Sequence, residues 1–165
     1  MRRRWMNGKT HVALGLAAAA ALGYDPLQLP VAATLALTAG ALLPDLDHRY
    51  GAKPLRKPLP PVLRQLAQVP AYLFRHRGPL HSLLVFPPLL LAAQALGYLP
   101  APYGVLAALG CASHLLADAL TPAGVPLLWP LVRRRVGLPL VRTGGRIERA
   151  LAPLLLAGWM WVGRR

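Results

Sequence analysis

The sequence predicts an all-α fold, a multi-pass transmembrane helical bundle of four to five helices in which residues 1–165 form one domain. Three observations support this prediction. Hydrophobic residues make up 55% of the chain and charged residues 15%, whereas about a quarter of the residues in soluble domains are charged. The apolar segments lack the strict alternation of half-buried strands. The net charge of +14 comes from basic residues that cluster between the apolar segments.

Five apolar segments are expected to form the helices: residues 11–24, 27–44, 79–99, 103–121 and, more weakly, 150–163. The third and fourth approach the ~20 residues that a helix needs to cross a bilayer. The first and fifth are short for a span, so tilted, interfacial and re-entrant arrangements stay open for them. Gly and Ala recur in the first, second and fourth segments, which favours close helix packing in lipid. Pro87 and Pro88 are expected to kink or interrupt the third segment.

The N-terminus has two interpretations. Its basic start, apolar stretch and small residues are also typical of a signal peptide. More apolar segments follow, rather than a polar mature domain, and this favours an uncleaved first helix.

The positions of the basic residues predict the topology. Of the 19 Lys and Arg, 17 precede the first segment or lie between the second and third or the fourth and fifth. With alternating helices all 17 fall on one side, which the positive-inside rule makes cytoplasmic. The chain is therefore predicted to lie in the cell inner membrane with basic cytoplasmic loops, one of which has an amphipathic stretch at 60–75. Basic residues are not interleaved with aromatics, so nucleic acid is not an expected partner.

The same topology gathers the polar side chains at the cytoplasmic ends of the helices. All five histidines and every acid except Asp25 fall in this layer. His114 and Asp118 are four residues apart, so they project from one helix face. Burying ionisable groups in a membrane is costly, and such groups are functional by default. Imidazole and carboxylate together suit Zn²⁺, and also Mn²⁺ or Fe²⁺.

The predicted site therefore holds one or two divalent ions, with zinc the expected metal. Its candidate ligands are His11, Asp45, His48, His76, His81, His114 and Asp118. Asp47 or Glu148 is expected to accept the proton of an activated water, and Arg77 to neutralise charge on a phosphate. Each residue also has a structural explanation: a helix cap, a loop residue, an ion pair inside the bundle or a positive-inside charge.

Five stretches in order resemble the YdjM-like family of predicted inner-membrane metal-dependent hydrolases. They are "KTHVALG", "GALLPDLDH", "HRGPLHSLL", "SHLLADALTPAGVPLLWP" and "RTGGRIE". The resemblance implies a multi-pass membrane protein with a metal centre and hydrolase activity. The order of the candidate ligands is also similar to that of zinc-dependent phospholipases C and nucleases, which points to phosphoester substrates.

The leading hypothesis is a membrane-bound metal-dependent hydrolase, phosphoesterase-like, that meets membrane lipid and acts on a phosphoester, lipid-like substrate. The alternative is a non-enzymatic membrane protein with a structural metal site or a role in metal transport. The outer halves of the segments hold almost no ionisable residue, which argues against a transport path. A third hypothesis, a nucleic-acid-associated membrane protein, predicts salt-dependent DNA binding that survives loss of His114.

Overall fold

The structure is a computed structural model that describes residues 6–25, 28–47, 60 and 78–162. In these ranges the chain forms α-helices and short 3₁₀ helices, with a single antiparallel bridge between Val125 and Val136. The elements are α1 (Gly8–Ala21), α2 (Val31–Leu42), η1 (Leu43–Asp47), η2 (Pro79–His81), α6 (Phe86–Ala95), α7 (Tyr103–Ala119) and α8 (Arg146–Val162). The all-α prediction is confirmed for this part of the chain.

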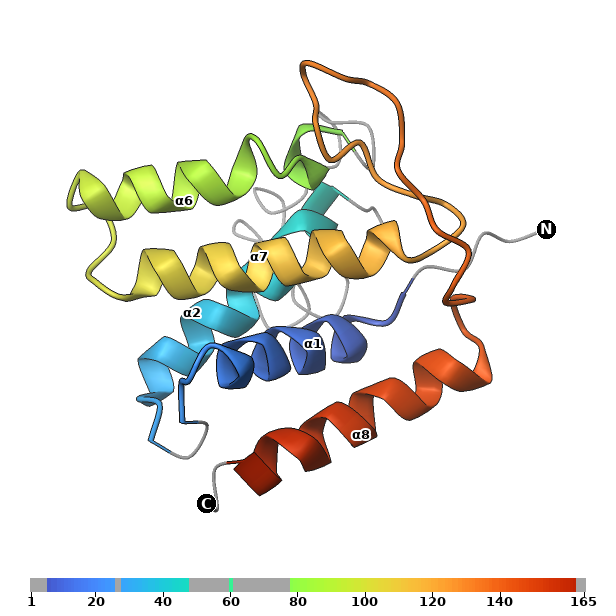
Figure 1. The fold of residues 1–165 in the computed structure, drawn as a ribbon. Coiled ribbons are helices and arrows are strands. Elements are labelled where there is room, and N and C mark those ends of the chain that lie inside the picture. The colour runs from blue at the N-terminus through green and yellow to red at the C-terminus, as the bar shows by residue number, and fades with distance from the viewer. Residues whose placement is uncertain (1–5, 26–27, 48–59, 61–77, 163–165) are drawn as a thin grey trace.

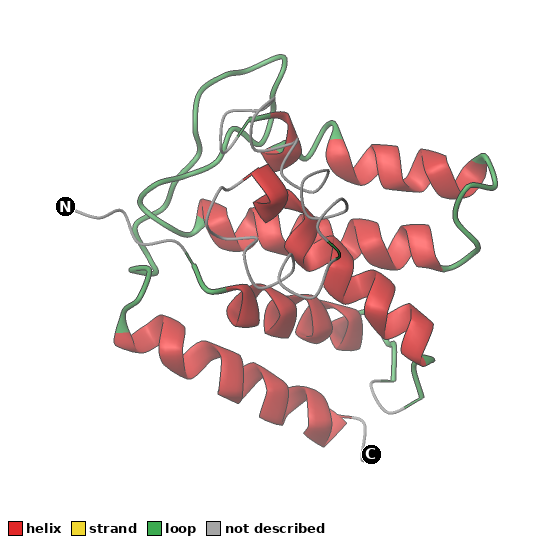
Figure 2. Ribbon diagram, turned by 180° about the vertical axis from the view of Figure 1, so that it is seen from behind, coloured by secondary structure: helices red, strands yellow, loops and turns green. Residues whose placement is uncertain are grey.

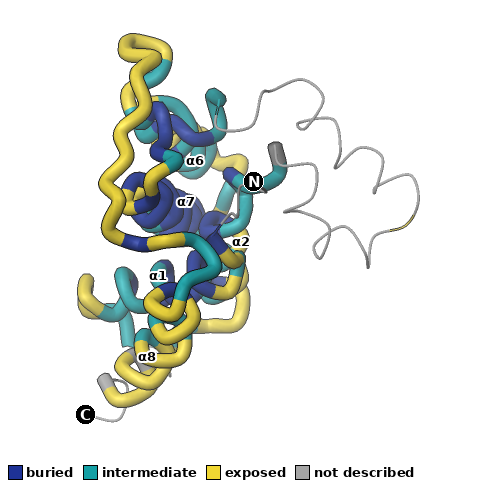
Figure 3. Tube along the Cα trace, turned by 90° about the vertical axis from the view of Figure 1, so that its right-hand side faces the viewer, coloured by how far each residue is buried: buried dark blue, intermediate teal, exposed yellow. Residues whose placement is uncertain are grey.

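Of the helices that the structure describes, four form one layer and a fifth crosses it. Figure 1 shows α6, α7, α1 and α8 side by side, and in the view from behind α2 runs obliquely across α1 and α7 (Figure 2). The contacts agree, since α7 packs against α1, α2 and α6, and α8 packs against α1. The side view separates the layer from α2 (Figure 3). Helix α7 is therefore the centre of the bundle.

The helices begin and end where local chemistry permits. The side chain of Asn7 caps α1 by accepting a hydrogen bond from the backbone N–H of Lys9 at 3.2 Å. Pro87 and Pro88 lie in the first turn of α6, where a missing N–H costs no helical hydrogen bond. The third apolar segment is therefore interrupted, as predicted, and its first part forms η2 instead.

Each of the five predicted apolar segments contains a helix, but the helices have only 10 to 17 residues. Among the residues that the structure describes, no helix combines the length and the hydropathy needed to cross a membrane. The predicted amphipathic stretch at 60–75 lies outside the described residues except for Pro60.

The apolar core lies where α1, α2 and α7 meet. Leu16 of α1, Leu37 of α2 and Leu106 of α7 are buried in one cluster with Ala19 and Ala33. Small side chains at the alanine positions let the helix axes approach closely. Leu115 and Ala117 of α7 are also buried, so apolar packing continues along this helix as far as His114 and Asp118.

Candidate metal centre

Five polar side chains from four segments meet in a buried cluster, which we call the His/Asp cluster. Its members are His11 of α1, Asp45 of η1, His81 of η2, and His114 and Asp118 of α7. The three histidines are 0–1% exposed and Asp118 is 3% exposed, whereas the side chain of Asp45 is 19% exposed. The cluster is thus closed on most sides and meets the surface at Asp45.

A close crossing of α2 and α7 determines where this cluster forms. A Cβ atom at Gly40 would lie 2.0 Å from the carbonyl oxygen of Ala107, and one at Gly110 would lie 2.1 Å from that of Leu37. Both distances are far below van der Waals contact. Only glycine at these two positions lets the two backbones touch.

The cluster residues lie about one helical turn from the crossing. Gly15 of α1 packs on the same point, since its Cβ would lie 3.5 Å from the Cβ of Ala41 and 3.8 Å from the Cα of Gly110. His11 precedes Gly15 by four residues, and His114 follows Gly110 by four. Residues four apart share a helix face, so a contact at the glycines brings the two imidazoles together one turn away.

The ligand atoms of the cluster form two overlapping groups. In one group, atoms of His11, Asp45 and His114 all lie within 4.8 Å of one another. In the other, atoms of His81, His114 and Asp118 do so. His114 belongs to both groups, so it is the central residue of the cluster.

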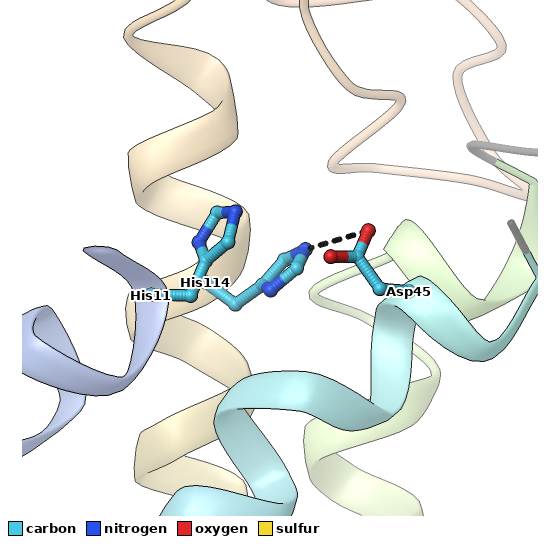
Figure 4. Close-up of side chains that lie close together, drawn as sticks. All are labelled: His11, Asp45 and His114. Carbon is cyan, nitrogen blue, oxygen red and sulfur yellow. Dashed lines mark ion pairs between the residues drawn. The ribbon is translucent and has the colours of Figure 1, made fainter. Parts of the chain in front are cut away.

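The distances within the cluster fit a shared ion better than direct contact. Nε2 of His114 lies 3.9 Å from Oδ1 of Asp45 (Figure 4). The two carboxylate oxygens of Asp118 lie 3.8 Å from Nε2 of His11 and from Nε2 of His81. Hydrogen bonds are about 2.7–3.2 Å long, so these pairs are too far apart for one. Two ligands each about 2.1 Å from a tetrahedral zinc ion are about 3.4 Å apart, so side-chain movements of about 0.5 Å would let each of these pairs share an ion.

The orientation of His114 is fixed by the backbone. Its Nδ1 lies 2.8 Å from the carbonyl oxygen of Ala41, and because a carbonyl only accepts, Nδ1 carries the proton. In the neutral imidazole Nε2 is then the atom with the lone pair, and it faces Asp45. Metal-binding histidines commonly donate their other N–H to a carbonyl in this way.

Ring packing completes the arrangement of the histidines. The rings of His11 and His114 are stacked, with centroids 3.7 Å apart and an angle of 19° between their planes. The ring of His81 meets that of His114 edge-on, with centroids 5.5 Å apart. The three rings therefore pack as a unit between the two carboxylates.

Other predicted site residues lie elsewhere or outside the described ranges. His48, His76 and Arg77 are outside the residues that the structure describes, and of Asp47 only the backbone, at the end of η1, is described. Their predicted roles stay predictions.

Glu148, a predicted proton acceptor, does not join either group of ligand atoms. It is 3% exposed, and its two carboxylate oxygens accept hydrogen bonds from the backbone N–H groups of Asn7 and Gly144. These hydrogen bonds connect the start of α1 to the start of α8, so Glu148 has a structural role whether or not it takes part in catalysis.

Sequence reasoning missed the two glycines of the crossing and the carbonyl of Ala41. A recurrence of Gly and Ala pointed to close packing but not to particular positions. For Gly110 the spacing was a usable signal, because this residue, like Gly15 of α1, stands four residues from a candidate histidine.

Comparison with known proteins places this chain in a family. Residues 6–164 match the family described as "YdjM inner membrane protein". The chain is 39% identical over 131 residues to the inner membrane protein YdjM of Escherichia coli, an alignment that covers 73% of this chain and 61% of that protein. The same figures hold for the YdjM protein of Shigella flexneri. This chain therefore spans less than two thirds of the length of these two relatives.

A relative of similar length is found in Bacillus subtilis. The chain is 36% identical over 160 residues to the uncharacterized protein YvsG of Bacillus subtilis, which covers 92% of this chain and 91% of YvsG. No solved structure matches the fold. The family match over nearly the whole chain shows that this protein belongs to the YdjM inner membrane protein family.

Proposed function

We propose that this protein is a membrane-bound metal-dependent hydrolase that acts on a phosphoester, lipid-linked substrate. The observation that carries the proposal is the His/Asp cluster itself. Three histidines and two aspartates from four separate segments turn inward to one buried place. Burying so many ionisable groups is costly unless they are compensated, and a divalent cation compensates all of them together.

The residues of the cluster fit zinc. Three imidazole nitrogens and two carboxylates are the ligand types that zinc prefers in catalytic sites, and the 3.8–3.9 Å separations allow shared coordination. A bound divalent ion supplies Lewis acidity for activating water and for polarising a phosphoryl oxygen.

The protein's own residues would orient the ligands and control access. The carbonyl of Ala41 keeps Nε2 of His114 directed at Asp45. The buried rings of His11 and His81 exclude bulk water from the inner side of the cluster. Asp45 is the most exposed member, so substrate and water approach from its side.

The surface supports a membrane location. Large apolar side chains are exposed along α2, where Val31 is 77% and Leu35 62% exposed. On α8 the exposed residues Ile147, Leu154 and Trp161 are spaced by seven, and residues with this spacing share one helix face. Apolar surface of this extent marks contact with lipid or another protein.

The charges of the described residues support the orientation. Basic residues lie at the start of α1, at the start of α8 and in the connection that follows α7, all at the end of the bundle that holds the cluster. At the opposite end, the connections 22–30 and 96–102 carry Asp25 as their one charged residue. Under the positive-inside rule the cluster faces the cytoplasm.

A structural metal site is the second candidate, and one observation favours it. Four of the five cluster side chains are at most 4% exposed, and structural zinc sites are closed whereas catalytic sites keep an open position. In this case the ion would hold α1, α7, η1 and η2 together without turning over a substrate.

Metal analysis combined with activity measurements tests both candidates. The full chain is purified in detergent as wild type, His114→Gln, Asp118→Asn and, as a matched control at the far end of the bundle, Asp25→Asn. We expect stoichiometric metal in the wild type and control and loss of metal in the two cluster variants. Metal-free wild-type protein would contradict both candidates.

Measurements of hydrolysis then distinguish an enzyme from a protein with a structural metal site. Phosphomonoesters, phosphodiesters and lipid phosphates are assayed before chelation, after chelation and after zinc is restored. Hydrolysis that follows the metal and disappears in Asp118→Asn supports the enzyme. Bound metal whose removal lowers the melting temperature, with no hydrolysis of any phosphoester, identifies the structural site.

A further inference from the structure

The connection between α7 and α8 contains a loop, residues 128–140, which we call the arginine loop. Backbone hydrogen bonds fix its base. Val125 and Val136 exchange two bonds of 2.9 Å, and the N–H of Leu138 donates to the carbonyl of Ala119 at 2.7 Å. The N–H of Leu140 donates to the carbonyl of Leu120. These bonds attach the loop to the end of α7 and give it a defined position in the fold (Figure 1).

The arginine loop exposes several large apolar side chains. Leu131 is 81% exposed and Leu140 is 63% exposed. The exposed set as a whole comprises Leu128, Leu131, Val132, Val136, Leu138 and Leu140. A loop fixed by so many hydrogen bonds does not expose six apolar side chains to water without cost.

Charge distinguishes this loop from an ordinary apolar patch. Arg133, Arg134 and Arg135 lie within it and are all exposed. The sequence has no Asp or Glu between Asp118 and Glu148, so no acidic side chain of this connection balances the three arginines. The loop offers positive charge and aliphatic side chains side by side.

This combination matches the interface of an anionic lipid leaflet. Arginine guanidinium groups bind phosphate oxygens with two parallel hydrogen bonds, and clustered basic residues are attracted to anionic lipid surfaces. Leucines beside them gain from entering the acyl region. Nucleic acid would use the arginines but offers little to six exposed aliphatic side chains, because the side chains that stack on bases are aromatic. The one aromatic residue of the loop, Trp129, is only partly exposed.

We propose that the arginine loop is a docking element for anionic phospholipid. Its arginines bind headgroup phosphates and its leucines enter the leaflet, at the end of the bundle where the His/Asp cluster lies. The inference concerns a different part of the chain from the proposed metal chemistry and does not need the protein to be an enzyme.

The test compares lipid retention by the full chain in detergent. Phosphatidylglycerol or phosphatidylcholine is titrated in, and bound lipids are counted by native mass spectrometry. One variant replaces Arg133, Arg134 and Arg135 with glutamine. The matched control makes the same change in the only other run of three arginines, Arg2–Arg4. A third variant carries Leu131→Ser and Leu140→Ser. Circular dichroism and metal content verify that each variant is folded.

We expect the wild type to retain about tenfold more phosphatidylglycerol than phosphatidylcholine, because three arginines act together at the surface. The loop arginine variant should lose this preference and the Arg2–Arg4 control should keep it. The leucine variant should bind less of both lipids. Unchanged metal content in all variants keeps this test separate from the proposed function.

Three results would overturn the proposal. They are an equal loss of preference in the Arg2–Arg4 control, equal retention of the two lipids by the wild type, and full retention by the leucine variant. A duplex DNA added in parallel provides a further check. DNA binding that the loop arginine variant abolishes, with lipid retention unchanged, would assign the loop to nucleic acid instead.

Discussion

Replacing Gly110 with alanine tests whether the crossing of α2 and α7 positions the His/Asp cluster. The new Cβ would lie 2.1 Å from the carbonyl oxygen of Leu37 and 2.8 Å from the backbone nitrogen of Ala41. Both neighbours are backbone atoms, so no side chain can rotate away. The two helices must separate by about 1 Å to bring the shorter contact above 3.0 Å, the distance below which Cβ contacts in proteins are essentially never found.

The effect on the cluster follows from its dimensions. Nε2 of His114 and Oδ1 of Asp45 are already 3.9 Å apart, longer than the ~3.4 Å between two ligands of a tetrahedral zinc ion. A further separation of about 1 Å would put the two atoms out of reach of one ion, so one ligand is lost. We expect metal affinity to fall about 10–100-fold, the range for changes that misplace a ligand.

Stability should fall as well. Forcing an extra methyl group into a packed contact costs about 1–3 kcal/mol, which for a chain of this length corresponds to roughly 2–4 °C in melting temperature per kcal/mol. Chelator competition measures the metal affinity, and circular dichroism in detergent measures the melting temperature.

Gly158 provides the matched control. It lies inside α8, and a Cβ built there meets nothing within 4 Å. Gly158→Ala should leave metal affinity unchanged and stabilise slightly, since alanine is the better helix former by about 1 kcal/mol. If Gly110→Ala keeps wild-type affinity and melting temperature, the crossing does not position the cluster and the packing argument fails.

Three further predictions use the same assays. Metal affinity should fall as pH falls, by up to about tenfold per pH unit for each histidine ligand that must lose a proton before it binds. A metal affinity that does not change between pH 7.5 and pH 5.5 would exclude histidine ligands. Glu148→Gln should lower the free energy of unfolding by about 1–3 kcal/mol, because the amide has an NH2 group in place of one of the two oxygens that accept from Asn7 and Gly144. Its metal content should not change. Unchanged stability with lost hydrolysis would show instead that Glu148 acts in catalysis. Ser82→Ala removes the hydroxyl that donates to the carbonyl of Trp129 at 2.5 Å. It should lower the free energy of unfolding by about 1 kcal/mol. An unchanged free energy of unfolding would show that this bond does not hold the arginine loop in place.

The sequence was sufficient to predict that His11, Asp45 and His114 lie close together. His11 opens an apolar segment, Asp45 closes the next and His114 lies near the end of another, so alternating helices must bring them to one end. That prediction needs only chain direction and helix ends. It does not depend on the exact length of any helix, which explains why it agrees with the structure although the helices are shorter than the apolar segments.

The immediate surroundings of the ligands were less predictable. His81 lies in the third expected helix, residues 79–99, but in the structure it ends η2, because Pro87 and Pro88 delay the start of α6 to Phe86. The contact of Gly110 with Leu37 depends on how two helices cross, and spacing within one helix carries no information about a crossing angle. Local sequence patterns do not specify how segments that are distant in the sequence contact each other.

The number of ions that the cluster can hold follows from His114. Its Nδ1 donates to the carbonyl of Ala41, so a neutral His114 has one lone pair and binds one ion. The two groups of ligand atoms both include His114 and therefore cannot be two independent sites. A second ion would have to be joined to the first through a bridging ligand, and Asp118 is suited to this, because one carboxylate oxygen faces His11 and the other faces His81. On this reasoning Asp118→Asn should impair every ion in the cluster, whereas Asp45→Asn affects only the ion that His114 binds.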